Sequence, residues 1–194
     1  MQVSIQQIAH ILQPILAKLA PTCKRIDLAG SCRRQEHWIS DIDIICEPME
    51  TEEDLMDLFG GVSVASRVKE WGKAVRSIGN VTKGDVDNGR MVSVRLSNGI
   101  KIDLFMPLPE DYYRQLAIRT GSTEFVKNII AARWVARGWV GTSDGLRRIE
   151  DCERVGERWR VKKGHIATEI PPAWKSEEEF FNWLGLVWKA PWVR

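Results

Sequence analysis

The apolar positions near the start of the chain recur with the spacing of an amphipathic helix. They fall at Ile5, Ile8, Ile11, Leu12, Ile15, Leu16 and Leu19. This pattern predicts a helix over residues 5–19 that turns one face to a core. Pro14 lies inside the pattern and predicts a kink or a break, because proline lacks the N–H that a helix interior needs.

Short apolar and alternating runs predict strands in the next part of the chain. The runs lie at residues 25–29, 41–46, 92–96 and 100–105. The last two flank Ser97-Asn98-Gly99, and Asn-Gly between such runs is a strong hairpin signal. The segment between Arg76 and Arg90 is rich in Gly, Asn and Asp and predicts a loop that one strand enters.

An acidic cluster, Glu50 to Asp54, suggests a helix instead. Thr51 can cap this helix over Asp54, and Gly60-Gly61 would end it.

The pattern changes at Pro107 and Pro109, so we expect two domains, residues 1–110 and 111–194. Residues 122–137 predict a helix with Phe125, Ile129, Ala132 and Ala136 on one face and Gly138 after its end. Beyond it we expect short β or irregular pieces, which include Trp159-Arg160-Val161. Ser176-Glu177-Glu178-Glu179 is a capping box that opens a final helix, expected to run to about Leu186. The predicted fold class is α+β, a mixed sheet with helices followed by a smaller α+β lobe.

Composition places the chain among ordinary globular proteins, at 44% hydrophobic and 28% charged residues. No apolar run approaches the roughly 20 residues needed to cross a bilayer, and the first residues do not resemble a targeting peptide. We therefore expect a cytoplasmic protein, in a bacterial or virus-infected cell, with no membrane partner. The four cysteines lack a C-x-x-C pair and are expected to be buried or half-buried, reduced thiols.

The net charge of +2 does not by itself indicate a nucleic-acid partner. The first part of the chain is slightly acidic and the second basic, which suits catalytic carboxylates and an anion-binding surface in different lobes, and equally a solvated surface. Most of the nine tryptophans are expected to pack a small core. Trp188 and Trp192 are the two that we single out as candidates for nucleic-acid contact.

Three aspartates carry the candidate chemistry. Asp41 and Asp43 are two apart on a predicted strand, so both side chains leave the same face. Two carboxylates that close repel each other unless a cation lies between them. Asp103 comes from the second arm of the predicted hairpin and joins them if that arm lies beside their strand. Such an oxygen-rich site suits Mg²⁺, although a lone D-x-D would more often decorate an exposed face.

The segment Gly30-Ser31-Cys32-Arg33-Arg34 strengthens that interpretation. Glycine lets the backbone approach an anion, and arginine offers a fork for phosphate oxygens. A triphosphate donor needs such a pocket beside the metal ions.

Together these motifs resemble those of the DNA polymerase X family, within the polymerase beta-like nucleotidyltransferase superfamily. Gly30 to Arg34 through Ser40-Asp41-Ile42-Asp43 matches the catalytic motif of the family, and residues 101–105 match the strand of its third carboxylate. Thr120-Gly121-Ser122 resembles the start of its thumb lobe, and residues 176–194 resemble its C-terminus. The resemblance extends over most of the chain and implies a catalytic palm followed by a thumb-like lobe, without further domains.

The resemblance also implies roles for individual residues. Asp41, Asp43 and Asp103 would be catalytic and would bind two Mg²⁺ ions, for which Mn²⁺ could substitute. Gly30, Ser31, Arg34 and Ser40 would hold the triphosphate, and Thr120, Gly121 and Ser122 would approach the sugar and base of the nucleotide. Contacts to the primer or to DNA are expected from Lys101, Arg147, Arg148, Lys162 and Lys163.

The chain departs from the family in two places. Ile118-Arg119 replaces an aromatic pair before Thr120, and Val126 replaces an asparagine that contacts the nucleotide.

The expected function is a metal-dependent DNA polymerase that adds dNMP from dNTP to a primer 3′-OH and releases pyrophosphate. Its expected substrates are primer–template or gapped DNA in short gap filling or repair, and a monomer is favoured. The alternative is a template-independent nucleotidyltransferase that acts on RNA, a protein or a small molecule. A catalytically dead DNA-binding protein is a third possibility, which the presence of all three carboxylates disfavours.

Overall fold

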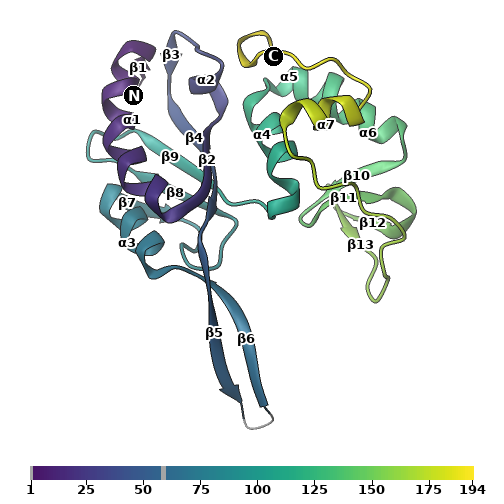
Figure 1. Cartoon of the computed structure of the whole chain (residues 1–194). Coiled ribbons are helices and arrows are strands. Elements are labelled where there is room, and N and C mark those ends of the chain that lie inside the picture. The colour runs from purple at the N-terminus through teal and green to yellow at the C-terminus, as the bar shows by residue number, and fades with distance from the viewer. Residues whose placement is uncertain (1, 58–59) are drawn as a thin grey trace. The chain divides into compact units, whose positions relative to one another are not determined.

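The structure is a computed structural model that describes residues 2–57 and 60–194. The chain divides into two compact units, Met1–Pro107 and Leu108–Arg194 (Figure 1). The division falls between Pro107 and Pro109, whereas the sequence places the boundary after residue 110.

The first unit is built on a mixed five-stranded sheet in the order β2-β4-β9-β8-β7. Its strands are β2 (Cys23–Leu28), β4 (Asp41–Pro48), β7 (Asn80–Lys83), β8 (Met91–Arg95) and β9 (Lys101–Phe105). The central pair β4–β9 is parallel and the other pairs are antiparallel. The predicted hairpin around Asn98-Gly99 is confirmed as β8–β9, and Gly99 has the positive φ of 85° that such a turn needs. The α+β class with a mixed sheet is confirmed as well.

The sheet has two chemically different faces, because successive side chains of a strand point to opposite sides. One face packs into the core of the unit. It carries Ile42 and Ile44 of β4, Val92 and Val94 of β8, and Ile102 and Leu104 of β9, all fully buried. The residues between them, which include Asp41, Asp43 and Asp103, therefore lie on the opposite face. The alternation of side chains along the strands thus places the aliphatic residues in the core and the three candidate aspartates together on the other face.

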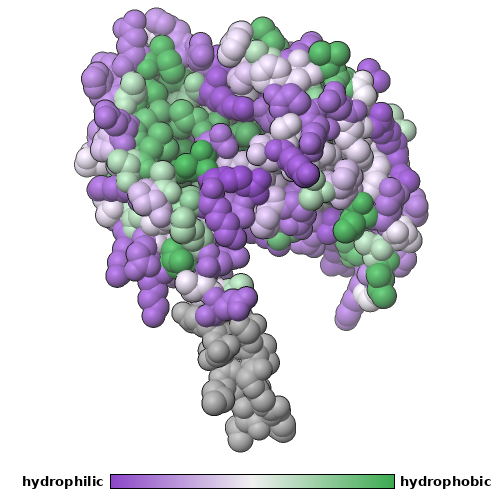
Figure 2. Space-filling model, viewed as in Figure 1, coloured by the Kyte–Doolittle hydropathy of each residue, from purple (hydrophilic) through white to green (hydrophobic). Residues whose placement is uncertain are grey.

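The helices α1 (Ile5–Leu19) and α3 (Lys69–Ile78) contribute to the same core. Ile8, Leu12, Ile15 and Leu19 of α1 are buried, as the predicted stripe requires. The helix continues through Pro14, so the predicted break does not occur. Burial of the stripe offsets the hydrogen bond that proline removes. Some apolar residues of α1 are only partly buried, and Figure 2 shows hydrophobic residues gathered on this part of the unit.

The prediction of a helix after Glu50 is wrong. Residues Glu50–Asp57 form β5, which pairs antiparallel with β6 (Gly60–Arg67) in an unbroken register from Glu50↔Arg67 to Asp57↔Gly60. The acidic segment has no apolar stripe at helical spacing with which to dock, whereas the following segment supplies a complete partner strand. Pairing with that strand outweighs local helix propensity. Helix α3, by contrast, was not predicted.

The remaining elements of the first unit are short. They are β1 (Val3–Ser4), which pairs with β3 (Trp38–Ile39), the helix α2 (Gly30–Arg33) and a 3₁₀ turn at Ala20–Thr22.

The second unit combines short helices with two β-hairpins. Its helices are α4 (Tyr112–Thr120), α5 (Thr123–Phe125), α6 (Ala132–Ala136) and α7 (Glu177–Trp183), with 3₁₀ turns at Pro109–Asp111, Ile149–Asp151 and Pro191–Val193. The hairpins are β10 (Trp139–Thr142) with β11 (Gly145–Arg148), and β12 (Cys152–Val155) with β13 (Arg158–Val161). Ser176 caps α7 as predicted, because its hydroxyl accepts a hydrogen bond from the N–H of Glu179. The helix ends at Trp183, before the predicted Leu186.

Aromatic side chains build the core of this unit. Trp134, Trp139 and Trp174 are buried together with Phe180 and Phe181. The core role predicted for most of the tryptophans is therefore confirmed for these three. Of the two candidates for nucleic-acid contact, Trp188 packs against this core and donates to Glu177, whereas Trp192 is 61% exposed.

The predicted helix over residues 122–137 contains a π-helical turn at Val126–Ala131, between α5 and α6. Such a turn holds more residues than an α-helical one and shifts the positions that follow it around the axis. Phe125, Ile130 and Trp134 are buried as a result, whereas Ile129 is 38% exposed. The predicted face is therefore wrong after Phe125.

No helix in the described part of the chain is long and apolar enough to cross a membrane. All four cysteines are buried and free, as expected from their spacing.

A buried aspartate ties a long loop to the β12–β13 hairpin. Asp151 is fully buried and accepts hydrogen bonds from His165 Nε2 (2.7 Å) and from the N–H (2.8 Å) and hydroxyl (3.0 Å) of Thr168. Burial acts to raise the pKa of Asp151, but these hydrogen bonds outweigh it and hold the pKa below its ordinary value. The charged carboxylate therefore stabilises the fold.

We expect Asp151→Asn to lower the melting temperature at pH 7. A folded-state pKa below the unfolded value stabilises above the unfolded pKa of about 4, and this stabilisation is lost as the pH falls through the folded pKa. The difference between wild type and variant should therefore shrink in melts below about pH 4. Glu157→Gln, at an exposed site of the same hairpin, is the control. Equal melting temperatures at pH 7 would contradict this assignment.

Candidate functional site

The parallel pairing of β4 with β9 brings the three candidate carboxylates together. The register pairs Asp41 with Lys101 and Asp43 with Asp103. One carboxylate oxygen from each of Asp41, Asp43 and Asp103 lies within 4.8 Å of the other two. The side chains come from neighbouring strands and the same face of the sheet.

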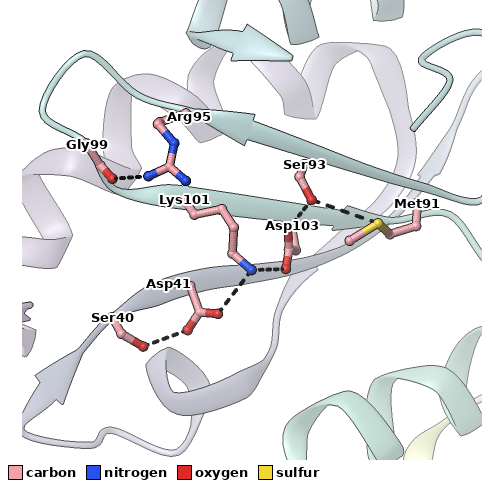
Figure 3. A network of polar contacts seen from close by, with 8 residues as sticks. All are labelled: Ser40, Asp41, Met91, Ser93, Arg95, Gly99, Lys101 and Asp103. Atoms are coloured by element: carbon pink, nitrogen blue, oxygen red, sulfur yellow. Dashed lines mark hydrogen bonds and ion pairs between the residues drawn. The ribbon is translucent and has the colours of Figure 1, made fainter. Parts of the chain in front are cut away.

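The three carboxylates differ in their surroundings. Asp103 is only 6% exposed, whereas Asp41 and Asp43 are half-buried. Ser93 Oγ donates to Asp103 Oδ1 at 2.6 Å, and Lys101 Nζ donates to Asp103 Oδ2 at 2.7 Å. Ser40 Oγ donates to Asp41 Oδ1 at 2.9 Å, and Lys101 Nζ lies 3.5 Å from Asp41 Oδ2. Figure 3 shows the lysine side chain reaching along the sheet toward both aspartates.

Lys101 is held in its charged form. Its hydrogen bond to Asp103 raises the pKa of the ammonium, burial acts against this, and the charges of Asp103 and Asp41 add to the rise.

Gly30 lets the backbone of α2 approach the carboxylates. The N–H of Ala29 donates to the carbonyl of Asp43 at 2.8 Å, which fixes the start of α2 beside β4. Gly30 has a φ of 57°, and a Cβ at this position would collide with the carboxylate of Asp43. A residue with a side chain would therefore be strained and would displace Asp43. The sequence predicted that Gly30 would let the backbone approach an anion. In the structure, the absence of a side chain at Gly30 makes room for the carboxylate of Asp43.

Cys32 lies on α2 near the same carboxylates. Burial raises the pKa of its thiol to about 12, and the charges of Asp43 and Asp41 contribute to the rise. The residue therefore remains a neutral thiol near neutral pH.

Two other predicted phosphate-binding residues lie close by in the chain. Ser31 belongs to α2 and is partly exposed. Arg34 follows α2 directly and forms an ion pair with Glu36, with Nε 2.8 Å from Oε1. A phosphate group at Arg34 would have to compete with that carboxylate.

The other predicted contact residues belong to the second unit. Thr120 is fully buried at the end of α4, Gly121 follows it, and Ser122 caps α5 through its hydroxyl. Arg147 donates to the carbonyl of Leu146, and Lys162 Nζ donates to the carbonyl of Glu150. Arg148 pairs with Glu169 at 2.8 Å and lies over the ring of Trp139, while Lys163 is exposed.

Ser93 contacts Asp103 but was not predicted from the sequence. It is 4% exposed and is the direct cross-strand partner of Asp103. The hairpin register could have identified it, because pairing around the Asn98-Gly99 turn places Ser93 opposite Asp103.

The donor set matches a hard divalent cation. It consists of carboxylate oxygens, with Asp41 and Asp43 open to solvent on one side, and the nearby Cys32 is a neutral thiol and hence a poor ligand. Mg²⁺ prefers a few carboxylates and keeps positions for water and substrate phosphates. The residues present therefore fit Mg²⁺, and also Mn²⁺, which binds the same ligand types.

Neither models of known protein families nor curated proteins match this chain.

We expect Gly30→Ala to weaken divalent-ion binding by at least about tenfold, because the new methyl group displaces a ligand. Isothermal titration calorimetry with Mn²⁺ measures the affinity, and circular dichroism checks the fold. Gly99→Ala is a matched control, since Gly99 also has a positive φ but an added Cβ there meets no atom within 4 Å. Unchanged affinity in Gly30→Ala would show that Asp43 is not displaced.

We expect Ser93→Ala to destabilise the protein by about 1–3 kcal/mol, because it removes a buried hydrogen-bond donor from a carboxylate. Released from Ser93, Asp103 should also bind Mn²⁺ about tenfold more weakly. Ser93→Thr keeps a hydroxyl and should recover part of both losses. Urea unfolding and Mn²⁺ titration measure the two effects, and Ser93→Ala with wild-type values in both would rule out this role.

Proposed function

We propose that this chain is a metal-dependent nucleotidyltransferase of the DNA polymerase X type. It would add dNMP from dNTP to the 3′-OH of a primer, in short gap filling or repair. The first unit would be its palm and the second its thumb-like lobe. The observation that carries the proposal is the convergence of Asp41, Asp43 and Asp103 from adjacent parallel strands, next to the Gly30–Arg33 helix.

Asp41 and Asp43 would hold two Mg²⁺ or Mn²⁺ ions, and Asp103 would share the one nearer the primer. Divalent ions at this position would supply the positive charge that stabilises the attacking and leaving oxygens of an in-line displacement at phosphorus. Ser93 would keep the Asp103 carboxylate oriented for this task.

Side chains of the protein would accept the proton and bind the triphosphate during the transfer. The 3′-oxygen of the primer forms a bond to the α-phosphorus, the bond from that phosphorus to the bridging oxygen breaks, and pyrophosphate leaves. Asp103 would accept the proton of the 3′-hydroxyl. Gly30, Ser31, Arg34 and Ser40 would bind the triphosphate, with Arg34 exchanging Glu36 for a phosphate.

The test is primer extension on a one-nucleotide gap and on single-stranded DNA, each with dNTP and with NTP. We expect templated incorporation of dNMP on the gapped duplex. Incorporation that ignores the template would favour the alternative nucleotidyltransferase, and no incorporation on any nucleic acid would contradict the polymerase proposal.

We expect Asp43→Asn to reduce kcat/KM for incorporation at least about a hundredfold. Mutating a residue that only hydrogen-bonds to a metal ligand already lowers activity by roughly 10–100-fold, and Asp43 would be a ligand itself. Glu70→Gln removes a carboxylate from the exposed surface of α3 and is the matched control. If Asp43→Asn retained wild-type activity, the carboxylates would not form the catalytic centre.

A further inference from the structure

The site poses an electrostatic problem when no divalent ion is bound. Three carboxylates that approach within 4.8 Å repel one another, and Asp103 is almost fully buried. Repulsion of this kind is relieved either by protonation or by a cation. Lys101 supplies a cation within the chain, because its ammonium contacts Asp103 and lies near Asp41.

The position of Lys101 follows from the sheet. It precedes Asp103 by two residues on β9, so both side chains share one face, and its Cα partner across the parallel pair is Asp41. The ammonium lies between Oδ2 of Asp41 and Oδ2 of Asp103, one oxygen of each of two candidate metal ligands. The ammonium thus contacts two of the three residues that would hold a divalent ion.

The lysine is also able to leave. Its side chain is 36% exposed, and four methylene groups let the ammonium swing toward solvent while the backbone stays in the ladder. Ser93 continues to hold the other oxygen of Asp103 when the ammonium moves away.

We propose that Lys101 is a tethered counter-ion of the carboxylate site, which holds Asp41 and Asp103 together in the ion-free state and competes with divalent cations for them. Lys101 stabilises the ion-free protein and lowers the affinity of the site for the metal ion. The site then fills only at divalent-ion concentrations high enough to displace the ammonium. This inference rests on the metal-binding part of the proposed function and not on nucleotidyl transfer.

The experiment compares Mn²⁺ affinity, by calorimetry or by electron paramagnetic resonance of the free ion, in wild type and Lys101→Met. Methionine keeps much of the length of the side chain but cannot compete for the carboxylates. We expect Lys101→Met to bind Mn²⁺ about tenfold more tightly or better. The reason is that two unit charges about 4 Å apart near a protein surface interact strongly, so removing the ammonium removes a strong competitor for the carboxylates. Its melting temperature should fall without divalent ions and rise more than that of wild type when Mn²⁺ is added.

Two further variants separate the local contact from general effects. Lys101→Arg keeps the positive charge and should bind Mn²⁺ with an affinity near that of wild type. Lys73→Met removes the same charge from the exposed surface of α3, where its side chain is 78% exposed, and should leave the affinity unchanged. If Lys101→Met folds only with Mn²⁺ present, its dependence on the ion supports the proposal directly.

The outcomes distinguish the two proposals. If wild type binds Mn²⁺ and Lys101→Met binds no more tightly, Lys101 is not a competitor, while the proposed function stands. If neither wild type nor Lys101→Met binds Mn²⁺, both the counter-ion and the proposed function are overturned. Equal tightening in Lys73→Met would also overturn the inference, because the effect would then come from net charge.

Discussion

The parallel pairing of β4 with β9 is the constraint on which the site depends. It places Asp43 directly beside Asp103 and Asp41 beside Lys101, on the face of the sheet that the core does not use. Like charges at such positions destabilise a sheet unless something compensates them. The hydroxyls of Ser93 and Ser40 and the ammonium of Lys101 provide that compensation within the protein. A strand pair this acidic makes physical sense as a place for a cation.

The same pairing explains why the carboxylates have fixed positions. The opposite face of these strands carries fully buried aliphatic side chains, so a shift in register would expose them to water. The carboxylates therefore occupy fixed positions that the core enforces. Gly30 adds a second restraint, because α2 approaches so closely that no side chain fits between it and Asp43. The proposed metal centre would need ligands placed in this way before the substrate arrives.

The second unit is stabilised by different interactions from those of the first. Its core is aromatic, with Trp174 meeting Phe180 and Trp183 edge to face, and the π-helical turn at Val126–Ala131 decides which residues join it. Most residues of the β12–β13 hairpin and of the long loop that follows it are exposed. The hydrogen bonds of Asp151 to His165 and Thr168 hold that loop in place instead. Any contact with a nucleic acid would be made by exposed side chains such as Lys163 and Trp192, not by the packed tryptophans.

The sequence alone determined the elements whose signals are local. These are the stripe of α1, the Asn98-Gly99 hairpin, the Ser176 cap and the two-residue spacing that puts Asp41 and Asp43 on one face. Only the tertiary structure decided what depends on a distant partner. The acidic segment after Glu50 became a strand because β6 pairs with it, and Asp103 met Asp43 because β9 lies parallel to β4. Pairing between strands that lie far apart in the chain leaves no periodic trace in the sequence, so local patterns could not show that Asp103 lies beside Asp43, although the hairpin register does place Ser93 opposite Asp103.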